Sequence, residues 1–104
     1  MIANVATMAQ SRSSSHVSLG LSLDRGNRRM IRAKVLGALA DGHQHVTIDC
    51  RSWKGIDVAV LSVLIQCAKM CFEHGAYFAL ANVPEDVAGS IRAMKLQDRV
   101  GLLE

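Results

Sequence analysis

The sulfur and imidazole side chains of Cys67, Cys71 and His74 are the first candidates for chemistry in this 104-residue sequence. Their i, i+4 and i+7 spacing places all three on one stripe of a helix. Thiolate and imidazole groups bind zinc, but zinc sites more often use Cys-x-x-Cys pairs or ligands from loops. Cysteines along an apolar helix face are more typical of a core. We therefore expect no metal and no cofactor, and keep a metal or redox sensor as an alternative.

Charged side chains form the second candidate group. Asp57 lies directly before a long apolar segment, where its carboxylate could cap a helix or face a partner. A basic stripe is formed by Arg25, Arg28, Arg29 and Arg32. Arginines bind phosphates, but no aromatic residues accompany this stripe to stack on bases. We expect a solvated face and no nucleic-acid partner, with an acidic protein partner as the alternative.

The elements that must position these groups follow from the periodicity of apolar residues. We expect strands over residues 2–9, 16–23, 46–50 and 76–83, and helices over residues 28–41, over residues 58–74 and from Pro84 onward. The alternating segment 16–23 is expected to return from an N-terminal hairpin through a serine-rich turn. The nearly continuous apolar run 76–83 predicts a strand covered by helices on both faces.

This order of elements predicts one α/β domain over residues 1–104. Alternating strands and helices imply a mostly parallel central sheet, with an N-terminal hairpin and helices packed around it. Asp24 and Asn27 are expected to cap the first helix. Val87, Ile91 and Met94 are expected to form the buried side of the last helix.

The composition narrows the class of protein further. Half of the residues are hydrophobic and only 4 % are aromatic, so the core must be aliphatic. The formal net charge of +3 is only mildly basic. The sequence contains no apolar run of about 20 residues and does not begin like a signal peptide, so we expect a cytoplasmic protein without membrane insertion. Without a glycine-rich phosphate loop or a convincing catalytic set, we expect no enzyme.

Residues 16–103 resemble a STAS domain, the fold of bacterial anti-sigma factor antagonists and of the cytoplasmic tails of sulfate transporters. The similarity begins with a hydrophobic residue before Asp49, followed eight residues later by Ile56-Asp57 and a helix that includes Leu61. Further matching segments are Leu23-Asp24, Ala40-Asp41-Gly42, Ala81-Asn82-Val83 and residues 96–103. Together, their order and spacing carry the resemblance.

In phosphoregulated STAS proteins, Ile-Asp is followed by Ser-Ser/Thr-Gly-Leu, and a histidine-kinase-like ATPase phosphorylates the second hydroxyl. Here Val58, Ala59 and Val60 occupy the hydroxyl, hydroxyl and glycine positions. Neither valine nor alanine can accept a phosphoryl group, so the charge switch is absent at Ala59. Val60 in place of glycine implies a bulkier and more apolar helix start.

The resemblance implies a non-catalytic interaction module that binds an anti-sigma factor or a related histidine-kinase-like regulator. The predicted contact residues are Asp24, Asn27, Trp53, Asp57, Val58, Ala59, Val60 and Leu61. Trp53 is expected in an exposed loop as a contact residue, and a lid over the sheet edge is its alternative role. The alternative function is a STAS scaffold that assembles with further copies, or a transporter-associated regulatory subunit.

Overall fold

The computed structural model describes residues 16–103. Its elements are β1 (His16–Gly20), the 3-10 helix η1 (Arg25–Asn27), α2 (Arg28–Ala40), β2 (His45–Asp49), α3 (Val58–Glu73), β3 (Tyr77–Ala81) and α4 (Glu85–Ala93). The predicted order of strands and helices is confirmed within this range. The predicted strand 2–9 and the serine-rich turn lie outside the described residues, and so does the hairpin that they would complete.

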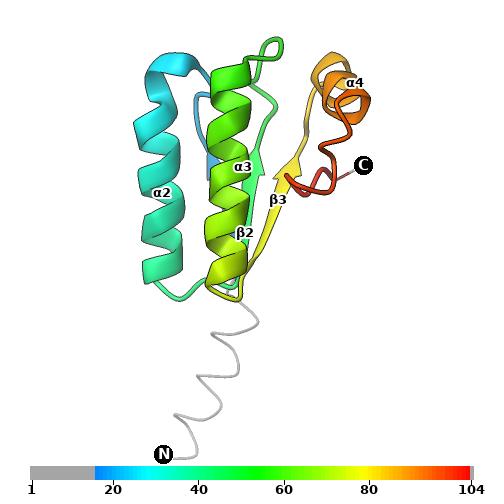
Figure 1. Ribbon diagram of the computed structural model, residues 1–104. Coiled ribbons are helices and arrows are strands. Elements are labelled where there is room, and N and C mark those ends of the chain that lie inside the picture. The colour runs from blue at the N-terminus through cyan, green and yellow to red at the C-terminus, as the bar shows by residue number, and fades with distance from the viewer. Residues whose placement is uncertain (1–15, 104) are drawn as a thin grey trace, which may run out of the picture.

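The three strands form one parallel sheet in the order β1-β2-β3. Val17, Val46 and Phe78 stand side by side in the register, and two residues further along so do Leu19, Ile48 and Leu80. These two apolar rows lie on the same face because side chains alternate along a strand. Figure 1 shows α2 and α3 side by side over one face of the sheet.

The core lies between this face and the two helices. Helix α2 contributes Ile31, Val35 and Ala38, which are buried at helical spacing. The buried stripe of α3 consists of Val60, Leu61, Leu64, Cys67 and Cys71. Each fully buried aliphatic side chain of this size contributes ~1.5–3 kcal/mol, so these stripes hold both helices against the sheet.

Two expectations about burial are wrong. Strand β3 has one buried residue, Leu80, and Tyr77 at its start is 70 % exposed, so it is not covered on both faces by the described residues. Helix α4 ends at Ala93, so Met94 is its C-cap and not part of the helix, and it is 41 % exposed. Val87 and Ile91 are buried as predicted.

The expected side-chain caps of the first helix are also absent. Neither Asp24 nor Asn27 makes a side-chain cap hydrogen bond. The Asn27 amide instead donates to the backbone oxygen of Ser22 at 2.6 Å. Asp24 acts through its backbone, whose oxygen accepts from the Asn27 N–H at 3.0 Å. The extra 3-10 turn before α2 therefore changes which groups are available for capping.

The end of the chain docks beside β3. Leu102 forms a single parallel bridge with Leu80. The Leu80 N–H donates to the Gly101 oxygen at 2.9 Å, and the Leu103 N–H donates to the Leu80 oxygen at 3.0 Å. Gly101 has a positive φ of 62°, and an added Cβ there would overlap the carbonyl oxygen of Phe78. Only glycine permits this close approach of two backbones.

Candidate functional site

The loops that follow β1, β2 and β3 meet at the carboxyl edge of the sheet, because the three strands are parallel. The Ser52 hydroxyl donates to the backbone oxygen of Leu21 at 3.2 Å, which joins the first two loops. The Asn82 amide donates to Asp49 at 3.3 Å, which joins the end of β2 to the loop after β3. This edge is where open α/β sheets place their binding sites.

Asp49 organises the middle of the edge. Its carboxylate accepts hydrogen bonds from the backbone N–H of Arg51 at 3.2 Å and from the guanidinium Nε of Arg51 at 3.1 Å. The backbone hydrogen bond from Arg51 has the largest effect and lowers the pKa of Asp49. Partial desolvation raises this pKa, but the side-chain bonds from Arg51 and Asn82 lower it further, so the net shift is downward. Asp49 is therefore an ionised structural link at neutral pH. Sequence reasoning used it only as part of a family pattern.

Asp57 caps α3 as predicted. Its carboxylate accepts from the backbone N–H of Ala59 at 2.8 Å and from that of Val60 at 3.4 Å. A second oxygen lies 3.4 Å from Arg25 Nε, which places η1 beside the start of α3. Desolvation raises the pKa of Asp57, but the two backbone bonds and Arg25 together outweigh it, so the pKa is lowered. The carboxylate stays charged and is held in a fixed position.

The residues after Asp57 divide into exposed and buried positions. Val58 is 68 % exposed and Ala59 is half-buried, whereas Val60 and Leu61 are buried in the core. Val60 does make the helix start more apolar, but its side chain and that of Leu61 lie in the core, so neither of these predicted contact residues is on the surface. The apolar group that a partner can reach is Val58. The helical spacing of Val60 to Leu64 could have predicted this burial.

The expectation that Trp53 lies in an exposed loop is also wrong. Trp53 lies in the loop that joins β2 to α3, but it is 1 % exposed and belongs to the hydrophobic core. Its backbone N–H donates to the Cys50 oxygen at 2.9 Å, which closes a turn directly after β2. The alternative role as a lid agrees with this position. Ile56, 37 % exposed, is the reachable apolar side chain of the loop.

The basic stripe lies next to this edge. A surface hollow of about 450 Å³ between the start of α2 and α3 is lined by Arg25, Gly26, Arg28, Arg29, Arg32, Val63 and Gln66. We call these residues the arginine groove. All four arginines are exposed. The sequence indicated the stripe on one helix, but not that α3 would supply the opposite wall.

The sulfur and imidazole set does not assemble as a site. Cys67 and Cys71 are buried, and burial raises the pKa of the first to about 12 and of the second to about 11. His74 is exposed, and its Nδ1 pairs with the Met70 backbone oxygen at 2.8 Å. Among residues 16–103, no three His, Cys, Asp or Glu side chains are grouped to hold a metal ion.

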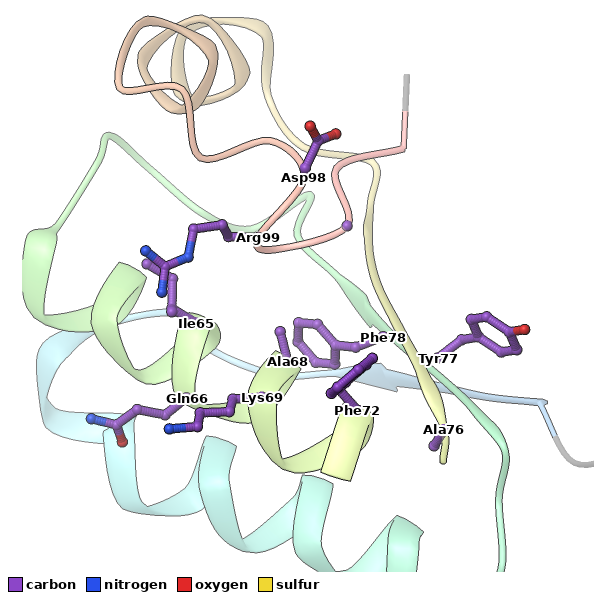
Figure 2. Close-up of a pocket in the computed structure, with 11 residues that line it drawn as sticks. Ile65, Gln66, Ala68, Lys69, Phe72, Ala76, Tyr77, Phe78, Asp98 and Arg99 are labelled. Atoms are coloured by element: carbon purple, nitrogen blue, oxygen red, sulfur yellow. The ribbon is translucent and has the colours of Figure 1, made fainter. Parts of the chain in front are cut away.

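A separate hollow of about 460 Å³ lies beside the C-terminal half of α3 (Figure 2). Phe78 and Ala68 point into it, Lys69 and Arg99 lie around it, and Phe72 is 82 % exposed on its rim. Phe72 is 14 residues beyond Val58, so the two lie about 21 Å apart along the helix. This hollow is therefore distinct from the carboxyl edge. Phe72 offers an exposed apolar position on the same helix, far from Asp57.

A parallel sheet covered by two helices, with a capped helix start at its carboxyl edge, is the arrangement of an α/β domain. The chain belongs to the STAS domain family: the family model described as "Mlab, STAS domain" matches residues 6–104. The resemblance seen in the sequence is thus confirmed. None of the described helices is both long and apolar enough to cross a membrane.

A solved structure shares this fold at low sequence identity. The protein TM1081, determined by NMR, is 22 % identical and aligns with a TM-score of 0.74. The alignment covers 86 % of this chain and 74 % of that chain. A search of the curated proteins found no match. The likeness to TM1081 supports the fold and nothing further.

Proposed function

We propose that this chain is a non-catalytic docking module whose partner, an anti-sigma factor or related kinase-like regulator, binds at the carboxyl edge of the sheet. The observation that carries the proposal is the start of α3, where the ionised Asp57 is fixed by its own helix and Val58 beside it is 68 % exposed. A charged group next to an exposed apolar one is suited to protein recognition. Asp24, Asn27 and Ala59 complete the proposed contact surface.

We further propose that phosphorylation does not control this contact at the family's acceptor position. Ala59 has no hydroxyl, and its backbone N–H is engaged with Asp57 at 2.8 Å. Since the side chains on either side are valines, no hydroxyl stands within the first turn to replace it. The partner would remain bound unless another input releases it.

A permanent scaffold or transporter-associated regulatory subunit is the second candidate. The exposure of Val58 and Ile56 favours it, because apolar side chains are characteristic of obligate interfaces. In that case the chain would copurify with its partner in a fixed ratio, and size-exclusion chromatography would show one stable complex or a self-assembly.

We call the proposed contact surface around Asp57 and Val58, at the carboxyl edge of the sheet, the docking edge. Capture of partners from the native cell extract tests it. We expect Val58→Asp to lose a specific partner that the wild type retains. The new acid in the first turn of α3 suits the positive end of the helix, so the fold should persist. Phe72→Asp, which places the same charge at the other end of α3, should retain the partner. Asp57→Lys should lose it as well. Identical partners in all four samples would contradict the proposal.

A further inference from the structure

The charges of α2 are opposite to those that stabilise a helix. No acidic residue lies in its first turn and no basic residue in its last. Arg28 and Arg29 instead occupy the first turn, and Asp41 is the C-cap. Because the helix dipole is positive at the N-terminus, cations there are unfavourable. Positions at which a sequence breaks a local rule are expected to be functional or strained sites.

The arginine groove concentrates the positive charge of the molecule. Four of the 12 lysine and arginine residues of the chain line it. Of these, Arg25 pairs with Asp57 and Arg28 donates its Nε to the Arg25 backbone oxygen at 2.9 Å. Helix α2 itself carries no acid that could pair with Arg29 or Arg32. The groove therefore presents guanidinium groups to an anionic ligand.

The surroundings of the groove identify the class of that ligand. Val63 and Gln66 form its other wall, and no aromatic side chain lines it, so nucleic-acid bases would find no stacking surface. The Arg25–Asp57 ion pair at 3.4 Å makes the groove continuous with the docking edge at Val58. Arginines beside an exposed apolar side chain are typical of protein interfaces.

We propose that the arginine groove receives acidic side chains of the protein that docks on the adjacent carboxyl edge. This inference rests on the proposed function and adds the chemistry of the partner. Arg29 and Arg32 provide bidentate donors for its carboxylates, while Val58 meets an apolar residue. The binding is steered by charge and weakens as salt is added.

An NMR titration of the full chain with a hexaglutamate peptide tests the groove without the natural partner. We expect amide shifts confined to residues 25–32, Val63 and Gln66, which disappear between about 50 mM and 500 mM salt. Arg29→Glu/Arg32→Glu should weaken binding at least about fivefold. Lys34→Glu, a charge reversal on the same helix outside the groove, should change it less than about twofold.

Three results of this titration would overturn the inference. These are equal binding to wild type and double variant, shifts spread over the whole surface, or tighter binding to an oligothymidylate or to phosphatidylglycerol vesicles than to hexaglutamate. Thermal unfolding serves as the control that the variants remain folded. Arg29→Glu alone should leave the melting temperature unchanged or raise it, because the acid suits the helix dipole. A lower melting temperature would contradict a functional origin of the reversed charges.

Capture of the natural partner with these variants distinguishes a failure of this inference from a failure of the proposed function. If Val58→Asp and Asp57→Lys lose a partner that Arg29→Glu/Arg32→Glu retains, the docking edge stands and the acidic contact is wrong. If Val58→Asp and Asp57→Lys lose no partner, the proposed function fails whatever the peptide shows. Loss of the same partner in all three variants supports both.

Discussion

At the scale of single residues, Asp57 carries both a structural and a proposed recognition role. One carboxylate oxygen closes the N-terminus of α3, and the other lies 3.4 Å from Arg25. Asp49 holds the neighbouring loops in a similar way through Arg51 and Asn82. Both carboxylates need their charge for these contacts, so the edge is built for neutral rather than acidic conditions.

We predict that acid weakens the fold through these two carboxylates. Their pKa values are lowered in the folded chain. Their stabilising contribution is therefore complete above the unfolded-state value of about 3.9 and is lost as the pH falls below it, through the folded-state pKa. Urea unfolding should give a free energy of unfolding that decreases as the pH falls below about 4.

Asp57→Asn provides the control for this pH dependence. Asparagine is also a good N-cap, so the variant should keep much of the stability at pH 7. It no longer titrates at this position, and its loss of stability between pH 5 and 3 should be smaller than that of the wild type. Equal losses in the two proteins would show that Asp57 does not contribute to the acid sensitivity.

At the scale of elements, the C-terminal segment is held by backbone contacts rather than by a further strand. It joins β3 through one bridge at Leu102 and through hydrogen bonds on both sides of Leu80. Gly101 permits these bonds because its α-carbon passes directly beside the Phe78 carbonyl. The position of the segment therefore depends on the absence of one side chain.

We predict that Gly101→Ala destabilises the protein more than Gly42→Ala. Both glycines have a positive φ, 62° and 86°, which costs an alanine about 1–2 kcal/mol. An added Cβ at Gly42 would meet open space, whereas at Gly101 it would displace the β3 backbone. Chemical denaturation should show a loss of at least about 2–3 kcal/mol for Gly101→Ala. Equal losses would contradict the close approach.

At the scale of the whole molecule, one aliphatic core joins the sheet, the helices and the β2–α3 loop. It includes all three cysteines, and Trp53 from the loop. The docking edge and the arginine groove are therefore both formed by elements that pack on the same core.

We predict that the three cysteine thiols react with a reagent only when the core unfolds. Cys50, Cys67 and Cys71 are each 0 % exposed, and burial raises their pKa to about 11–12. Since the thiolate is the reactive form, we expect a disulfide reagent to react slowly with the native protein at pH 8 and with all three thiols in denaturant. Zinc should give no protection. One rapidly reacting thiol, or protection by zinc, would favour the metal or redox sensor.

Much of the fold follows from local sequence patterns. The change in the period of apolar residues from two to 3.6 identified the described strands and helices. The aspartate before Val58 identified the cap of α3. Both features depend on residues that are neighbours in the sequence. The same logic failed for Asp24 and Asn27. Their capping role was decided by a short 3-10 turn that no pattern marks.

The composition and periodicity of the sequence therefore determined an aliphatic α/β domain with an aspartate at a helix start. Tertiary structure decided which of these residues a partner can reach. Trp53 packs into the core although it lies in the β2–α3 loop, whereas Val58 at the start of α3 is exposed. The arginine groove gained its second wall from α3, more than 30 residues away. Burial and grooves depend on such distant contacts, whereas periodicity describes only the face that each element offers.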